Sequence, residues 1–263
     1  MGRIVRERGA CSRSRTTSPS RFREVKTMRI LWGNGDIESE ERFETDFSSI
    51  GVSGSCKLRL HRGDYKIEVT SDSNLLPYIN TRISGGTLYL GFKPFTWVVR
   101  KTELEFNVTL PELSRIGSSG STEVEVDAFS GDVFSAFLSG SGEVKADTLD
   151  YESISLGSSG SGGFGAIVQA HDFKLHSSGS GATSIMGAAK NAEISLSGSA
   201  DIDGRNFAAE EARINSSGSS LVELRVVKKL DAHISGSGDV RYWGDPAVSR
   251  HVSGSGRVQR SGD

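Results

Sequence analysis

The sequence predicts an all-β fold, a parallel β-solenoid with coils of 18–20 residues and a β-rich N-terminal cap. Three observations predict it: an internal repeat, apolar residues at fixed offsets within that repeat, and variable residues at the neighbouring offsets. The repeat is the tripeptide Ser-Gly-Ser, with ordered sequence between the copies. Its glycines are at positions 54, 120, 140, 160, 179, 198, 218, 236 and 254. From the second copy onward the steps are 18–20 residues, and their drift favours a right-handed coil.

Alignment of the copies on the first serine, taken as position 0, separates inward from outward positions. Position +4 varies freely, whereas positions +5 and −3 are apolar in nearly every copy, and this period of two is typical of strands. Each coil is therefore expected to hold three short strands and three turns, stacked about 4.8 Å from the next coil. Position +5 contains Leu58, Val124, Val144, Phe164, Thr183, Ile202, Val222, Val240 and Val258, and position −3 contains Ile50, Ile116, Ala136, Leu156, Leu175, Ile194, Ile214, Ala232 and Arg250.

The repeated serines and glycines are expected to form a structural ladder along the surface. Serines at equal height in stacked coils would align, and the glycines would supply a positive φ or a close backbone approach. The ladder residues are Ser119, Gly120, Ser139, Gly140, Ser159, Gly160, Ser178, Gly179, Ser197, Gly198, Ser217, Gly218, Ser235, Gly236, Ser253 and Gly254.

The chain divides into three segments by composition and pattern. Residues 1–35 form a basic segment expected to be a disordered leader. Residues 36–115 alternate as strands around turns and are expected to form the β-rich cap and the first coils, which would cover an aggregation-prone edge. Residues 116–260 form the repeat solenoid, continuous with the cap in one domain.

Composition and charge exclude several classes of function. Residues 1–28 contain eight Lys/Arg and two Glu, so the remainder of this chain of net charge −2 is acidic, which argues against a nucleic-acid partner. The sequence contains no run of 18 apolar residues, so it predicts no membrane span. The N-terminal residues have the charges of a signal peptide without its apolar segment, so the localisation stays open between envelope and cytoplasm. Cys11 and Cys56 form neither a disulfide framework nor a metal motif.

No residue pattern predicts catalysis or a cofactor. The serines are too regular to be nucleophiles, and the acidic residues at position +4 alternate with Lys, Gly, Ala, Leu and Arg. The weak metal candidates are His233 and His251, which fall at the outward position −2 of successive coils and should stack about 4.8 Å apart. His176 occupies the same position in an earlier copy. An exposed column of imidazoles without a metal is the simpler interpretation.

Five segments, in this order, carry a resemblance to a known family. They are Phe47–Ser55, Asn74–Ile79, Gly85–Leu90, Tyr242–Pro246 and Val252–Gly256, combined with the Ser-Gly-Ser-Gly coils. Over about residues 36–260 the chain resembles the bacterial family of unknown function described as putative auto-transporter adhesin, head GIN domain. The resemblance implies a right-handed β-helix and an extracytoplasmic, adhesin-like role.

These observations support three hypotheses from different classes. The first is a non-catalytic, adhesin-like binding or structural protein of the cell envelope that contacts a glycan or a protein surface through its Ser/Gly/Thr face. The second is a self-assembling, cytoskeletal-type scaffold in which solenoids stack end to end. Under this hypothesis the partner is another copy of the chain, so self-association is expected. The third is a polysaccharide-processing enzyme, for which no clustered carboxylates are found.

Overall fold

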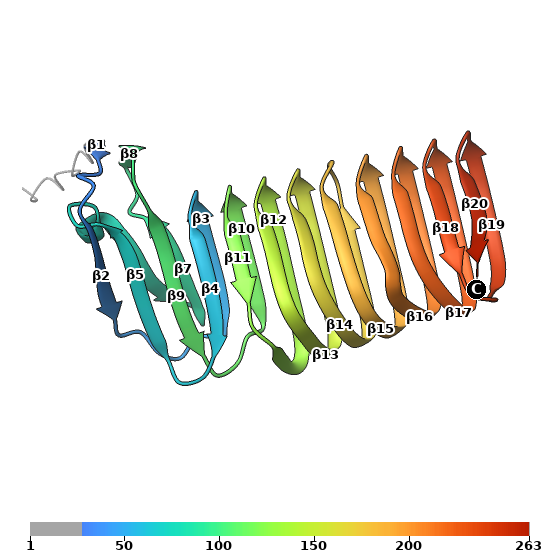
Figure 1. Ribbon diagram of the computed structural model, residues 1–263, viewed down its shortest axis with the longest axis horizontal. Coiled ribbons are helices and arrows are strands. Elements are labelled where there is room, and N and C mark those ends of the chain that lie inside the picture. Colours follow the sequence, from blue (N-terminus) through green and yellow to red (C-terminus); the bar gives the residue numbers. More distant parts are fainter. Residues whose placement is uncertain (1–27, 263) are drawn as a thin grey trace, which may run out of the picture.

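The computed structural model describes residues 28–262, and these residues form one elongated stack of β-strands (Figure 1). Among them, no helix has the length and apolar character needed to cross a bilayer. The elements are β1 Arg29–Trp32, β2 Ile37–Arg42, β3 Ser49–Gly54, β4 Lys57–Arg62, β5 Lys66–Asp72, the 3₁₀ turn η1 Leu76–Tyr78, β6 Ile79–Ser84, β7 Thr87–Phe92, β8 Thr96–Arg100, β9 Leu104–Leu110, β10 Arg115–Gly120, β11 Glu123–Val126, β12 Phe129–Gly140, β13 Glu143–Gly160, β14 Gly163–Ser177, β15 Ala182–Gly198, β16 Asp201–Gly218, β17 Leu221–Gly236, β18 Asp239–Trp243, β19 Ala247–Gly254 and β20 Arg257–Gly262.

The coils from β10 to β20 stack in parallel, each on the coil before it, which confirms the parallel β-solenoid. In β13 and β14, for example, Val144 pairs with Phe164 and Ile154 pairs with Phe173. The expected division of each coil into three short strands is wrong for β13–β17. These strands are 15–18 residues long and bend around the corners with only local register shifts, because no inserted loop interrupts the ladder there. The ladder ends only at the Ser-Gly-Ser corner.

The repeating apolar positions form the core of the solenoid. All nine residues at position +5 are buried, including the polar Thr183, and so are the residues at position −3 except Arg250. Together with other buried side chains they make one continuous cluster. Larger rings fill the interior between coils, as where the rings of Phe173 and Phe207 lie with centroids 5.1 Å apart. Each coil contributes a few side chains, so the stack buries what no single coil could.

The glycines of the repeat are required by the backbone. Gly160 has a φ of +131°, a conformation that residues with a Cβ adopt only with strain. A Cβ built there would also overlap the carbonyl oxygen of Gly140 on the preceding coil. That carbonyl accepts hydrogen bonds from the backbone N–H groups of Ser161 and Gly162, at 2.9 and 3.1 Å. The same φ region recurs at most of the other repeat glycines, with Gly179 as an exception.

The N-terminal end departs from the chain order of the coils. Strand β3 lies in parallel between β7 and β10, and β4 lies in parallel between β9 and β11. The chain therefore turns back after β4, builds the rung beyond the first Ser-Gly-Ser coil, and returns to β10. Antiparallel strands β2, β5 and β6 pair around this rung, at the left of Figure 1.

The structure describes only part of the segment expected to be a disordered leader, residues 1–35. Residues 1–27 lie outside the described residues, but Arg29–Trp32 form β1 and pair in parallel with β8, so the boundary expected at residue 35 is too late. The buried carboxylate of Asp72 fixes the segment that follows. It accepts hydrogen bonds from the backbone N–H groups of Gly35 at 2.7 Å and Thr102 at 2.8 Å, and from the Thr102 hydroxyl at 3.1 Å.

Candidate binding face

One column of outward side chains runs along the whole solenoid at position −2. Each member pairs in register with the next, on the neighbouring strand of the stack. In spatial order from the N-terminal end the column is Tyr89, Gly51, Gly117, Phe137, Gly157, His176, Ser195, Asn215, His233 and His251. We call this column together with the adjacent ladder serines the neutral strip. Within it, two surface hollows open along one sheet.

The histidines lie in the first of these hollows. It has a volume of about 460 Å³ and is lined by the three imidazoles of the column, by Asn215, and by serines. The rings of His233 and His251 lie on successive coils with centroids 6.1 Å apart and tilted by 41°, wider than the expected stacking distance. His233 Nε2 lies 3.1 Å from Asp231 Oδ1. Across residues 28–262, no three His, Cys, Asp or Glu side chains gather as metal ligands would.

The second hollow lies near the N-terminal end of the strip and has aromatic walls. Its volume is about 380 Å³, and its lining includes Tyr89, Phe137, Gly117, Asn80 and ladder serines. Both rings are large apolar groups in solvent, with Tyr89 42% exposed and Phe137 49% exposed. No charged residue lines either hollow of the neutral strip. We call this one the aromatic hollow and the other the histidine hollow.

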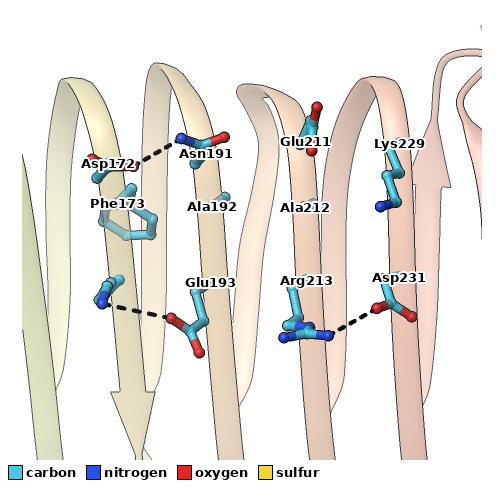
Figure 2. Close-up of a pocket in the computed structure, with 11 residues that line it drawn as sticks. Asp172, Phe173, Asn191, Ala192, Glu193, Glu211, Ala212, Arg213, Lys229 and Asp231 are labelled. Atoms are coloured by element: carbon cyan, nitrogen blue, oxygen red, sulfur yellow. Dashed lines mark hydrogen bonds and ion pairs between the residues drawn. The ribbon is translucent and has the colours of Figure 1, made fainter.

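A charged hollow of about 410 Å³ lies on the same sheet beside the histidine hollow (Figure 2). Several of its side chains pair with one another from coil to coil. Asn191 Nδ2 donates to Asp172 Oδ1 at 2.8 Å, and Arg213 pairs with Asp231 at 3.3 Å. Hydrogen bonds from the side chains of Asn191 and His171 favour the charged form of the Asp172 carboxylate and so lower its pKa. His233 of the neutral strip also reaches this hollow, through its contact with Asp231.

The ladder serines stack in register along the outer edge of the neutral strip. Ser119, Ser139 and Ser159 pair in order, and so do Ser197, Ser217, Ser235 and Ser253. Ser178 is exposed on the coil between these two runs. The glycine after each of these serines except Ser253 has a carbonyl that accepts from the following coil, as described for Gly140. The ladder thus combines a backbone seam with a row of surface hydroxyl groups.

A second set of serines lies inside the solenoid, which the sequence reasoning missed. Position −1 is buried even where it is serine, at Ser118, Ser158, Ser177 and Ser216. Ser158 Oγ donates to the carbonyl oxygen of Gly162 at 2.8 Å, and the hydroxyl groups of Ser216 and Ser220 share a hydrogen bond. The partner comes four residues later in both cases. A serine at position −1 followed at this spacing by a small residue, glycine or serine, was the signal available in the sequence.

Two buried ionisable groups lie away from the neutral strip. Burial raises the pKa of the Cys56 thiol to about 11, which keeps it protonated and unreactive. Burial also raises the pKa of Tyr151 to about 12, and its hydroxyl donates to the carbonyl oxygen of Leu113 at 2.6 Å. Both groups therefore serve packing of the core.

Comparison with known proteins gives solved relatives over most of the chain. A putative lipid binding protein from Parabacteroides distasonis is 26% identical with a TM-score of 0.84, covering 89% of this chain and 100% of that one. A putative adhesin from the same species is 25% identical with a TM-score of 0.84, covering 88% and 100%. A putative adhesin from Parabacteroides merdae is 25% identical with a TM-score of 0.80, covering 89% and 99%. No curated protein matches the chain.

The names of these relatives describe binding or adhesion, and none describes an enzyme. The sequence motifs, the stacked coils and the solved relatives agree with a match to one family over residues 46–246. The chain belongs to the family described as putative auto-transporter adhesin, head GIN domain.

Proposed function

We propose that the protein is a non-catalytic, adhesin-like binding module of the cell envelope that contacts a glycan or a protein surface through its neutral strip. The observation that carries this proposal is the pair of uncharged hollows along one straight sheet face. Exposed aromatic rings at outward positions of such a face are typical of binding surfaces, because they offer a large contact area with few rotatable bonds.

The physical properties of the strip favour binding over solvation alone. Hydroxyl and amide groups, which carry no charge, lose less solvation energy on contact than charged groups do. The hydrogen-bonded ladder beneath them is rigid, so a partner does not have to order a loop. Several of the neighbouring charges are already paired within the protein, as between Arg213 and Asp231. These paired groups compete less for a partner at the neutral strip than free charges would.

One feature argues against the end-to-end scaffold. In the last described coil, position −3 is Arg250 instead of an apolar residue, and its guanidinium donates to the carbonyl oxygen of Val258 at 3.3 Å. A second solenoid stacked on this coil would bring its apolar column against this charge. Inward charges on an outer strand discourage such pairing. Concentration-dependent filaments in electron microscopy would favour the scaffold instead.

The name of the lipid-binding relative raises a second possible ligand class. The interior of this solenoid is filled by one continuous cluster of side chains, so a lipid would have to lie on an outer face. The neutral strip is the face with exposed aromatic rings, and a lipid is therefore an alternative outcome of the same binding test.

Bead adhesion tests the proposal with a matched pair of variants. The full chain is coupled to beads, and adhesion is measured under flow on surfaces coated with mucin, neutral polysaccharides or a matrix protein. Asn215→Arg places a charge in the centre of the strip, whereas Gln169→Arg places the same charge on an exposed position outside it. We expect adhesion to at least one coat, retained in Gln169→Arg and reduced at least about tenfold in Asn215→Arg. Equal adhesion of the two variants contradicts a role for the strip.

A further inference from the structure

We propose that the aromatic hollow binds one uncharged pyranose ring of a glycan, seated above Gly117 between Tyr89 and Phe137. This inference rests on the proposed function and names the ligand class for one part of the neutral strip. It is argued from the position of the two rings, from a glycine that the backbone does not require, and from the polar groups at the rim.

The two aromatic rings leave one open rung between them. The ring of Tyr89 lies over Gly51, where a Cβ would meet its Cδ1 at 3.0 Å, and the ring of Phe137 lies over Gly157, where a Cβ would meet its Cδ2 at 2.8 Å. Gly117 lies between these covered glycines in the column. A Cβ at Gly117 would meet only the carbonyl oxygen of Ile50, at 3.9 Å. The floor of the hollow is therefore bare backbone.

The width of the hollow suits one saturated six-membered ring. Tyr89 and Phe137 are three rungs apart in the column, which corresponds to roughly 14 Å between their backbones at the usual strand spacing. The Tyr89 ring occupies the first of these rungs by lying over Gly51. The space above Gly117, between the Tyr89 ring and the strand that carries Phe137, is therefore about two rungs wide, within a hollow of about 380 Å³. A longer glycan would continue along the column.

Gly117 has no structural reason to be glycine. It lies inside strand β10 without the positive φ of the corner glycines, and no atom crowds the space where a Cβ would stand. At the same position other coils have Ser195, Asn215 and His233. Glycine inside a strand lowers stability relative to a residue with a side chain, and it often marks a place where a ligand approaches the backbone closely. We infer that Gly117 keeps the floor open for a ligand.

The chemistry of the walls and rim matches a neutral sugar. One face of a pyranose ring presents C–H groups that pack on an aromatic ring, while its edge presents hydroxyl groups that need donors and acceptors. Tyr89 and Phe137 supply the aromatic surfaces. Ser119 and Ser139 stand at the rim, and no hydrogen bond engages their hydroxyl groups within residues 28–262. No Lys or Arg lines the hollow itself; the Arg82 guanidinium contacts the Tyr89 ring, 5.8 Å from its centroid.

Titration with defined saccharides tests the inference in the full chain. The probes are neutral trisaccharides of glucose, mannose, galactose and N-acetylglucosamine, followed by saturation-transfer NMR and calorimetry. We expect at least one to bind the wild type. Phe137→Ala should weaken it roughly tenfold through loss of one stacking surface, and Gly117→Leu should abolish binding by filling the floor. Gln169→Leu, at an exposed position outside the neutral strip, is the matched control and should bind as the wild type does.

The possible results separate this inference from the proposed function. If no neutral trisaccharide binds but bead adhesion still depends on Asn215, the inference is overturned and the proposed function stands. If a trisaccharide binds equally well to Gly117→Leu, the hollow is not its site and the inference is also overturned. Binding of phosphatidylcholine vesicles that is lost in Phe137→Ala, without saccharide binding, would assign the hollow to a lipid. Melting temperatures close to that of the wild type would show that the Gly117→Leu and Gln169→Leu variants are folded.

Discussion

The seam of repeat glycines makes a sharp prediction about Gly160→Ala. Alanine at a φ of +131° is strained by roughly 1–3 kcal/mol. Its Cβ would also displace the carbonyl of Gly140, which weakens the hydrogen bonds from Ser161 and Gly162 at about 0.5–1.5 kcal/mol each. Together these effects should lower the free energy of unfolding by roughly 2–4 kcal/mol, after partial relaxation.

Equilibrium unfolding in guanidinium chloride, followed by far-UV circular dichroism, measures this loss. Gly117→Ala is the matched control, since it adds the same methyl group to an open position with no positive φ. We expect the control to change stability by less than about 0.5 kcal/mol or to raise it slightly. The reasoning is refuted if Gly160→Ala is as stable as the wild type, or if both variants lose the same amount.

Three further predictions concern the core, the buried carboxylate and the histidines. Phe207→Ala removes a fully buried ring that packs against a second aromatic ring and should lower the free energy of unfolding by about 3–5 kcal/mol. The control Val227→Ala, at an exposed position, should change the free energy of unfolding by less than about 0.5 kcal/mol. The denaturant midpoints of the two variants and the wild type measure the difference. Burial acts to raise the pKa of Asp72, but its backbone and hydroxyl hydrogen bonds outweigh this and lower it. The stabilisation from Asp72 is therefore complete above its ordinary pKa of about 4 and is lost as the pH falls through the lower folded value. Asp72→Asn should be less stable at pH 7 by about 1–3 kcal/mol and should lack this part of the acid transition. An acid unfolding profile identical to that of the wild type contradicts this prediction. Zn²⁺ should raise the melting temperature of the wild type no more than that of His233→Ala, because no third ligand gathers with the His233 and His251 side chains among residues 28–262. A rise that is selective for the wild type would reveal a metal site.

Most of the solenoid could be predicted because each coil repeats the same pattern. Residues such as Val144 and Ile202 come at one fixed offset from a Ser-Gly-Ser corner, and both are buried. A single physical requirement, burial of one apolar face per coil, therefore fixes the inward positions. The continuous bending of strands such as β13 could not be predicted, because corner residues keep their hydrogen bonds without any distinctive sequence.

The candidate site was only partly visible in the sequence. The offset of Phe137 and His233 from their corners places both in the outward column before any coordinates are known. Tyr89 could not be assigned to that column, because β7 has no Ser-Gly-Ser corner and joins the stack out of chain order beside β3. The aromatic hollow depends on that pairing, so it is visible only in three dimensions.

The turned-back path of the chain also bears on the order in which the solenoid assembles. Between β16 and β17, Ile202 pairs with Val222 after only 20 residues, whereas Ser49 of β3 pairs with Arg115 of β10 after 66 residues. Closing the longer segment costs about 1 kcal/mol more in chain entropy, and it must bring several antiparallel strands with it. Contacts between nearby residues are made fastest. We therefore expect nucleation among the later coils, with the N-terminal rung, and the glycan seat that it completes, formed last.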